Sequence, residues 1–346
     1  MTHPISIVIP NYNGAPYVRE TIESLLGQTF GDFKLTFLDD QSTDESLEIA
    51  ESFRDPRYSV VRSSERVTMA GNWNRAAALA DAPYFLLAHN DDVYEPEFLE
   101  VMLPLIEGSP RAFMAHCKVQ NIDDDGKPIY TPQQAYKDSL WPTEDPCERP
   151  VKEELAWMRR GDIVIAPTAV FRTEAFRAIG PFDERYQMVT DWEYWLRGLL
   201  HGYTMVCTHR RLMRWRRHAR TATRAMEASM RRFHEEIDVC EWVAAEAYRL
   251  HLADGPEPDY RIVLNTMLTE FAGRLERSDR AGARAIYDLA LSRVPAFRRS
   301  PHRLVMQFGL ASGRPGGRAL KWAETAYLDF VSAGRRAPSD GRPSSR

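Results

Sequence analysis

The sequence predicts an α/β fold whose central sheet contains parallel strands joined by crossover helices. Over residues 5–88, short apolar runs rich in β-branched residues alternate with segments of helical spacing. Strand-helix-strand alternation at this spacing is typical of parallel strands in one sheet. At 346 residues the chain can hold one large domain or two smaller ones.

The predicted elements follow one another in regular order. Strands are expected over residues 5–9, 33–38, 58–62 and 84–88, and helices over residues 17–28, 45–53 and 70–79. Pro10 ends the first strand, and Ser42, Thr43 and Asp44 can cap the second helix. Beyond these, we expect a helix over residues 98–106, a strand over 112–119, a strand pair over 163–171, and helices over 173–179 and 191–202.

The turn after the first strand excludes two common nucleotide-binding motifs. The chain continues as Asn-Tyr-Asn-Gly over residues 11–14, so neither a dinucleotide-binding G-x-G-x-x-G nor a P-loop follows the strand. A nucleotide would therefore be bound through side chains rather than through a glycine-rich phosphate cradle.

Two adjacent carboxylates, Asp91 and Asp92, follow the fourth strand. Ligands of α/β proteins bind beyond the carboxyl ends of the strands, which is where these side chains are expected. A Mg²⁺ or Mn²⁺ ion would relieve the repulsion between them. A solvated turn with Asp as the cap of a helix that begins near Tyr94, with Pro96 in its first turn, explains the pattern equally well.

Composition narrows the class of protein. The formal net charge is −4, and the four cysteines at 117, 147, 207 and 240 form no C-x-x-C pair. This argues against a zinc site or a disulfide scaffold and fits a reducing cytosol. The N-terminal stretch lacks a basic region before its short apolar run, and no segment approaches roughly 20 apolar residues. We expect a cytoplasmic protein that is soluble or docks on the inner face of a membrane.

Three segments together resemble family 2 glycosyltransferases, which have the GT-A fold. They are SIVIPNYNGAPYVRETIESLLGQTF, FLDDQSTDESLEIAESF and NWNRAAALADAPYFLLAHNDDVYEPEFLE, and the likeness extends over residues 5–218. The resemblance implies a Rossmann-like mixed sheet flanked by helices. It also implies transfer of a sugar from a nucleotide-diphosphate donor, with a UDP- or dTDP-sugar as first choice, to a hydroxyl acceptor with inversion. The acceptor would be a saccharide, a lipid-linked saccharide or another small molecule of cell-surface polysaccharide or glycoconjugate synthesis.

The resemblance assigns a donor pocket to the carboxyl edge of the first strands. Asp39 would accept a hydrogen bond from the base, a charge-assisted contact. Pro10, Asn11 and Tyr12 would wall the base and ribose, with the Tyr12 ring as a stacking face, and Asn74 would lie near the pocket.

The resemblance also assigns the metal and the diphosphate. Asp92 would bind the Mn²⁺ or Mg²⁺ that bridges the donor diphosphate, and Asp91 would hold the ribose hydroxyl or a metal-bound water. Near the end of the matching region, His218 would be a further metal ligand and Arg217 would hold the diphosphate.

Asp191, in Thr-Asp-Trp-Glu-Tyr-Trp, is the residue that the resemblance marks as catalytic base. Without the resemblance, a helix N-cap would be the simpler explanation of this aspartate. The chain departs from the family pattern at three places: Gln41 replaces glycine, Asn90 replaces the first Asp of D-x-D, and Thr190 replaces Glu or Gln.

An arginine-rich segment follows, with nine arginines and one acid over residues 209–234. It could form a solvated helix face or contact an acidic protein surface, a lipid-diphosphate acceptor or an anionic membrane. Nucleic acid is not expected, because aromatic residues are sparse and no binding motif is present.

Several other polar segments have ordinary explanations. Arg66 and Arg75 could approach phosphate, although salt bridges on a helix face explain them better. The acidic residues 123–126 predict a solvated turn rather than a calcium site. Residues 131–150 are rich in proline and are expected to form an acceptor-side loop.

The predicted organisation is a catalytic domain over residues 1–222, a helical extension over 223–332 and a disordered tail over 333–346. The extension could form a homodimer, dock on a membrane or shape the acceptor pocket. Two other functions stay open: a catalytically silent sugar-nucleotide-binding or scaffold protein, and a sugar nucleotidyltransferase. The second would require a glycine-rich loop after the first strand.

Overall fold

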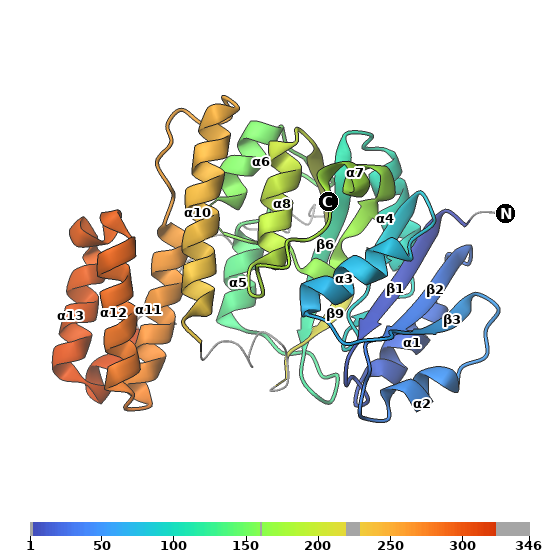
Figure 1. Cartoon of the computed structure of the whole chain (residues 1–346), viewed down its shortest axis with the longest axis horizontal. Coiled ribbons are helices and arrows are strands. Elements are labelled where there is room, and N and C mark those ends of the chain that lie inside the picture. The colour runs from blue at the N-terminus through green and yellow to red at the C-terminus, as the bar shows by residue number, and fades with distance from the viewer. Residues whose placement is uncertain (1–2, 160, 219–228, 323–346) are drawn as a thin grey trace, which may run out of the picture. The chain divides into compact units, whose positions relative to one another are not determined.

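The computed structural model of the chain contains a mixed sheet of nine strands flanked by helices, which confirms the predicted fold class (Figure 1). The structure describes residues 3–159, 161–218 and 229–322. The strands are β1 (Ile5–Asn11), β2 (Phe33–Asp39), β3 (Tyr58–Arg62), β4 (Tyr84–Leu87), β5 (Val93–Tyr94), β6 (Ala112–Ile122), β7 (Cys147–Glu148), β8 (Val170–Arg172) and β9 (Thr204–Arg216). They are ordered β3-β2-β1-β4-β8-β6-β9-β5, and β7 pairs with β9.

The first four strands form the parallel half of the sheet. β1 lies between β2 and β4, and β3 pairs with the outer side of β2. Every position of β1 is buried, as expected for a strand that is covered on both faces. Because parallel strands end at the same edge, Asn11 lies opposite Asp39 in register.

The other half of the sheet is mixed. β8 is antiparallel to both β4 and β6, whereas β6 and β9 run parallel. The short strand β5 is antiparallel to β9 and pairs Val93 with Arg214. This pairing brings the chain that follows β4 beside the end of β9, although more than a hundred residues separate the two in the sequence.

Helices connect these strands much as predicted. Those before residue 205 are α1 (Val18–Leu26), α2 (Ser46–Glu51), α3 (Met69–Ala78), α4 (Phe98–Glu107), α5 (Pro132–Ser139), α6 (Val151–Met158), α7 (Thr173–Ile179) and α8 (Thr190–Leu200). α3 begins where the Thr68 hydroxyl accepts a hydrogen bond from the backbone N–H of Gly71. α7 has the predicted bounds, and Gly180 ends it with a φ of 95°, which favours glycine.

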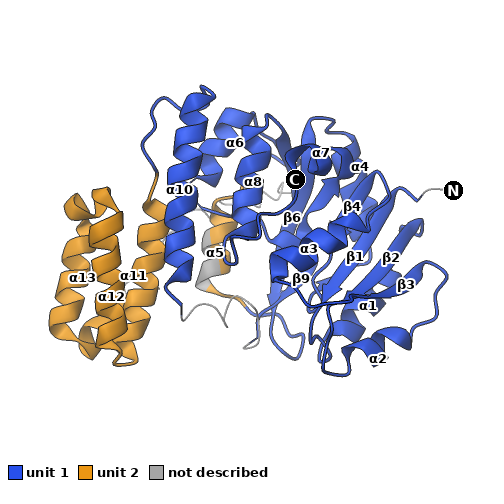
Figure 2. Ribbon diagram, in the orientation of Figure 1, with its two compact units in different colours: residues 1–129, 142–258 blue, residues 130–141, 259–346 orange. Residues whose placement is uncertain are grey.

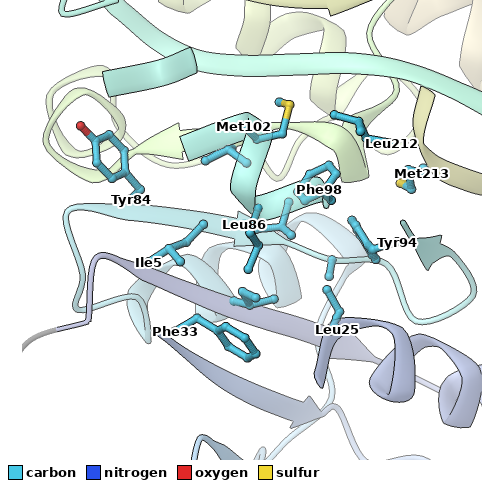
Figure 3. Packing of buried hydrophobic residues seen from close by; sticks show 14 of the residues in the cluster. Ile5, Leu25, Phe33, Tyr84, Leu86, Tyr94, Phe98, Met102, Leu212 and Met213 are labelled. Atoms are coloured by element: carbon cyan, nitrogen blue, oxygen red, sulfur yellow. The ribbon is translucent and has the colours of Figure 1, made fainter. Parts of the chain in front are cut away.

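The two faces of the sheet have different cores. Side chains of a strand alternate between faces, so Ile5 and Leu86 pack with Leu25 of α1 and Phe98 of α4 on one face (Figure 3). On the other face, aromatic rings of β4, β8, α7 and α8 pack against one another; Phe85 and Phe171, for example, stack with ring centroids 4.8 Å apart.

Four predicted segments differ in the structure. The expected loop 131–150 contains α5 and β7, and the expected strand pair over 163–171 is the 3₁₀ turn η1 (Ala166–Thr168) followed by β8 alone. The helix expected to open at Tyr94 begins at Phe98, because β5 first pairs with β9. The arginine-rich segment is a strand as far as Arg216 rather than a helix face.

The chain divides into two compact units (Figure 2). The first comprises residues 1–129 and 142–258, and the second comprises residues 130–141 and 259–346. Helix α10 (Arg231–Arg249) groups with the sheet in the first unit. The domain boundary predicted at residue 222 stays a prediction, and the expected disordered tail 333–346 lies outside the described residues. No helix of the described ranges is long and apolar enough to cross a membrane.

The second unit consists of helices. They are α5, α11 (Arg261–Glu276), α12 (Arg280–Arg293), η2 (Pro295–Arg299) and α13 (Pro301–Ser312), and the chain is helical again over residues 314–322. Phe271, Ile286 and Met306 are fully buried in its core. Of the last helix predicted from the sequence, over residues 319–331, only the first residues are described.

Leu86→Ala should lower the free energy of unfolding by about 2–5 kcal/mol, because Leu86 is fully buried in a central strand and its loss leaves a cavity. Urea unfolding followed by circular dichroism measures this. Leu304→Ala, at a side chain that is 70% exposed, is the matched control and should change stability by less than about 0.5 kcal/mol. Equal effects of the two substitutions would contradict the described core.

Candidate active site

A buried network of hydrogen-bonded polar side chains lies at the carboxyl edge of the parallel strands. Asn11, which ends β1, is fully buried and donates to Asp39 Oδ1 at 3.2 Å and to Ser42 Oγ at 2.9 Å. Its side-chain Oδ1 accepts from the side-chain amide of Asn90. Asn11 thus connects the ends of β1, β2 and β4, and this role is structural whatever ligand the edge binds.

The turn after β2 explains one departure from the family pattern. Asp39 Oδ2 accepts from the Ser42 backbone N–H at 3.1 Å, and between them Gln41 adopts a φ of 59°. Glycine adopts such a backbone without strain, which is why a glycine suits this position. Here the Gln41 amide donates to the Ser64 carbonyl at 2.6 Å and so anchors the strained residue.

Tyr12 and Arg66 form a cation–π pair at the same edge. The guanidinium carbon of Arg66 lies 3.4 Å from the centroid of the Tyr12 ring. One face of the Tyr12 ring, which was expected to stack on a base, is therefore covered by an exposed arginine of the same chain. Arg75 pairs with Asp40 and Glu65, as the salt-bridge explanation of that arginine predicts.

Asn74 is held by the turn that follows α7. Its amide nitrogen donates to the Phe182 carbonyl at 2.9 Å, and its oxygen accepts from the Phe182 N–H at 2.8 Å. These bonds direct the amide to the backbone of that turn. The role of Asn74 in donor binding stays a prediction.

Three potential metal ligands gather after β4. Oxygen or nitrogen atoms of His89, Asp91 and Asp92 lie within 4.8 Å of one another. The two aspartates were predicted from the sequence, whereas His89 was missed. Its position directly before Asn-Asp-Asp was the available signal, since imidazole and carboxylates are common partners in binding Mn²⁺-type ions.

Asp92 is the most constrained of these groups. It is fully buried; Oδ1 accepts from the Arg216 backbone N–H at 2.9 Å, and Oδ2 has no hydrogen-bond partner in the part of the chain that the structure describes. Burial, and then the neighbouring Asp91, raise the pKa of Asp92 well above its ordinary value, while the Arg216 bond opposes this. A buried carboxylate oxygen without a partner beside a second carboxylate and an imidazole is a suitable ligand set for a divalent cation.

Asp91 faces the end of the matching region. Its Oδ2 lies 2.9 Å from His218 Nε2, and the His218 ring packs on Tyr17 with centroids 4.7 Å apart. The predicted ligands Asp91 and His218 are thus neighbours. Arg217 lies over the Trp215 ring at 4.3 Å, and its backbone N–H donates to the Ile122 carbonyl.

Arg216 supports this arrangement and was not singled out in the sequence. Its buried side chain donates to the Asp91 carbonyl at 2.9 Å and to the carbonyls of Asp123 and Asp124 at 3.1 Å, and it pairs with Glu20. A buried arginine that satisfies carbonyls from two loops fixes both of them. The acidic residues 123–126 accordingly form the predicted turn, with Gly126 at a φ of 77°.

The arginines of β9 are used within the chain. Arg210 pairs with Glu97 at 3.0 Å, and Arg214 pairs with Glu95 at 3.2 Å. Together with the Arg216–Glu20 pair, these ion pairs involve most of the arginines of β9. Residues 219–228 of the predicted arginine-rich segment, including Thr221 and Thr223, lie outside the described residues.

Asp191 lies in the first turn of α8. Burial lowers the pKa of His89, and the charges of Asp91 and Asp191 oppose that shift. The first turn of a helix favours an ionised carboxylate. Asp191 Oδ1 accepts from the Trp192 N–H at 2.8 Å.

Glu235 of α10 holds the chain that leads into α8. This buried carboxylate accepts hydrogen bonds from the backbone N–H of Gln187, at 3.0 and 3.1 Å to its two oxygens, and of Met188 at 2.7 Å. Arg231 pairs with it at 2.6 Å. A helix beyond the region of family resemblance therefore fixes the approach to Asp191.

Comparison with known proteins identifies a family for the first half of the chain. The family model described as Glycosyl transferase family 2 matches residues 6–180. An uncharacterized glycosyltransferase of Rickettsia prowazekii, RP339, is 28% identical over 223 residues, which cover 63% of this chain and 65% of that protein. The chain spans between about a third and just under two thirds of the length of the first curated relatives that it matches.

Two solved structures share the fold. S. aureus TarS 1-349 in complex with UDP-GlcNAc superposes with a TM-score of 0.57 at 16% identity and covers 94% of this chain and 92% of its own. The mannosyltransferase PcManGT from Pyrobaculum calidifontis, in complex with GDP-Man and Mn²⁺, gives a TM-score of 0.52 at 16% identity and covers 97% and 87%. At this identity the likeness concerns the fold alone.

Asp92→Asn should stabilise the protein at pH 7 in the presence of a chelator. The unfolded chain ionises this carboxyl near pH 3.8, and the folded chain does so only at a higher pH because of burial. Between these two pH values the folded wild type binds one more proton than the unfolded chain, so the free energy of unfolding of the wild type falls as the pH rises. The advantage of the variant should therefore appear above about pH 4, increase up to the folded-state pKa and then level off.

Melting temperatures from pH 4 to pH 8 measure this difference. Asp125→Asn, at a side chain that is 74% exposed in the nearby turn, is the control and should follow the wild type. A wild type more stable than Asp92→Asn at pH 7 would contradict the buried, cation-free carboxylate.

Glu235→Gln should loosen residues 186–189, because an amide NH₂ would face backbone donors that now share two carboxylate oxygens. We expect faster hydrogen exchange at the Gln187 and Met188 amides and a loss of about 2 kcal/mol in the free energy of unfolding. Glu246→Gln, at a surface pair with Arg249 on the same helix, should change neither by much. Unchanged exchange at both amides in Glu235→Gln would show that this contact does not hold the loop.

Proposed function

The chain belongs to glycosyl transferase family 2, and on that basis we propose that it transfers a sugar from a nucleoside diphosphate sugar to a hydroxyl acceptor with inversion at the anomeric carbon. The observation that carries the proposal is the cluster of His89, Asp91 and Asp92 after β4. Asp39 ends the parallel strand β2, and Asp191 lies in the first turn of α8, where its charge acts on His89. A silent scaffold has no need of all of these buried or half-buried carboxylates, since each costs stability.

The nucleoside is proposed to bind along the carboxyl edge of β1 and β2. Asp39 would accept from the base edge, and Pro10, Asn11 and Tyr12 would wall the base and ribose. A UDP- or dTDP-sugar is the first choice of donor from the family resemblance. The two solved neighbours hold UDP-GlcNAc and GDP-Man, so donors with different bases fit this fold. Arg66 must leave the face of Tyr12 if a base is to stack there.

The diphosphate is proposed to lie over the cluster that follows β4. Asp92, through its free Oδ2, with Asp91 and His89 would hold Mn²⁺ or Mg²⁺. His218 lies against Asp91 and would act as a further ligand or orient that carboxylate. When bound, the cation would neutralise the charge of the leaving nucleoside diphosphate. Arg217 is proposed to contact the diphosphate from the end of β9.

Asp191 is the proposed catalytic base. Its carboxylate would take the proton of the acceptor hydroxyl, and the acceptor oxygen would then attack the anomeric carbon on the face opposite the diphosphate. The bond from the anomeric carbon to the phosphate oxygen breaks as the new glycosidic bond forms, and its electron pair leaves with the diphosphate. One displacement inverts the configuration.

The setting of the reaction rests on the resemblance. We propose a cytoplasmic enzyme of cell-surface polysaccharide or glycoconjugate synthesis with a catalytic part over residues 1–222 and a helical extension over 223–332. A sugar nucleotidyltransferase is less well supported, because the turn after β1 continues into α1 without a glycine-rich loop.

A thermal-shift assay with nucleoside diphosphates, with and without Mn²⁺, should identify one nucleotide that stabilises the protein in a metal-dependent way. At about 100 times its dissociation constant the ligand should add about 2.7 kcal/mol of stability. Asp92→Ala should lose the metal-dependent part of the shift. Asp191→Asn should keep it and should lose about 10²–10⁴-fold in sugar transfer, the usual contribution of a general base.

The paired variants separate binding from chemistry. A nucleotide shift in the wild type without any sugar transfer would favour the sugar-nucleotide-binding alternative, and sugar transfer that Asp191→Asn leaves unchanged would contradict the proposed base. No shift with any nucleotide would contradict the proposed donor site.

A further inference from the structure

An apolar stripe without charged residues lies on the exposed face of α13. Leu304 and Phe308, one helical turn apart, are 70% and 63% exposed, and Pro301 and Ala311 are exposed on the same side. Residues on the opposite side of the helix, Met306 and Gly309, are buried in the unit. Soluble proteins seldom expose a contiguous set of large apolar side chains without a binding partner.

Both ends of the stripe are basic. Residues 289–322 contain seven arginines and lysines and no acidic residue. Arg298 and Arg299 precede α13, and Arg314 and Arg318 follow it; all four are exposed, and none forms an ion pair with an acid of the described ranges. This contrasts with Arg274, Arg277 and Arg284 of the same unit, which pair with Glu270 or Asp288.

A hollow of about 550 Å³ is formed by the end of α12 and by η2, the turn that leads into α13. Its apolar residues are Leu291, Pro295 and Ala296, and its cations are Arg298 and Arg299. Two guanidinium groups at an apolar hollow match a phosphate attached to a hydrocarbon chain, since a guanidinium binds phosphate oxygens with paired N–H donors. Trp322, which is 75% exposed, follows on the next helical segment.

We propose that α13 and its flanking arginines dock the protein on a bilayer that contains anionic phospholipid. The apolar stripe would enter the boundary between headgroups and acyl chains, and the arginines would contact lipid phosphates at both of its ends. From Leu304 to Ala311 the stripe is about 10 Å long, which suits shallow insertion in the membrane plane. The proposal is independent of the sugar-transfer reaction.

A second copy of the chain fits this surface less well. In a two-fold contact the same patch meets itself, so the four unpaired arginines of one protomer would face those of the other. Like charges at the rim of an interface cost affinity, and no described acid of the patch compensates them. The same cations are favourable next to lipid phosphates.

Vesicle co-sedimentation of the full chain tests the proposal. Vesicles of phosphatidylcholine alone are compared with vesicles of phosphatidylcholine and phosphatidylglycerol. We expect binding only to the second kind, with an affinity that falls as salt is added. The variants Leu304→Ser/Phe308→Ser and Arg298→Gln/Arg299→Gln should each weaken binding by at least about tenfold, because each removes one of the two contributions.

The control variant is Arg277→Gln/Arg284→Gln, which removes two charges from paired arginines of the same unit and should bind like the wild type. Unfolding midpoints verify that all variants remain folded, as expected for exposed positions. Absence of binding to the anionic vesicles would overturn the proposal, as would equal loss in the control. A dimer that Leu304→Ser/Phe308→Ser converts to a monomer, with unchanged vesicle binding, would reassign the stripe to an interface between copies.

Discussion

The hydrogen bond from the Arg216 backbone N–H to the buried Asp92 carboxylate is the constraint on which the candidate site depends. It joins the turn after β4 to the last residue of β9, which lies 124 positions later in the chain. The Arg216 side chain also donates to the carbonyls of Asp91, Asp123 and Asp124. One residue therefore holds together the turn after β4, the end of β9 and the 123–124 turn. The remaining oxygen of Asp92 has no partner among the described residues, and this makes the position unfavourable unless a cation is bound.

Much of the fold could be predicted because its signals are local. β1, β2, β3 and β4 are short apolar runs, and the helices between them have clear spacing, so periodicity located each within a few residues. β9 was missed because its arginines make it resemble a solvated segment. Its place in the sheet comes from pairing with β6, and its arginines pair with Glu95 and Glu97, which are remote in sequence. No local pattern contains that information.

The same distinction applies to the site. Asp91, Asp92 and Asp191 stand in recognisable motifs, whereas Arg216 becomes relevant only when the segment that follows β4 meets the end of β9. His89 directly precedes Asn-Asp-Asp, and the structure shows that it joins the two aspartates in one cluster. Glu235 could not have been found at all, because it lies in a helix without motifs and acts on backbone N–H groups far from it in sequence. Helix α10 is therefore part of the same compact unit as the sheet, although the sequence predicted that it belongs to the C-terminal helical extension.

The Arg66–Tyr12 pair would compete with a base that stacks on the same face of the Tyr12 ring. A guanidinium on an exposed ring contributes roughly 0.5–1 kcal/mol, so its displacement would weaken the apparent affinity for a stacking base about two- to fivefold. After displacement Arg66 could still interact with Asp40 at the same edge, because burial raises the pKa of that carboxyl and the positive charge of Arg66 already opposes the rise. The side chain would therefore have two alternative anions, Asp40 within the protein and the diphosphate of the proposed donor. Base binding would then change the orientation of Arg66 at the same time. An optical signal from the Tyr12 ring would respond to both changes.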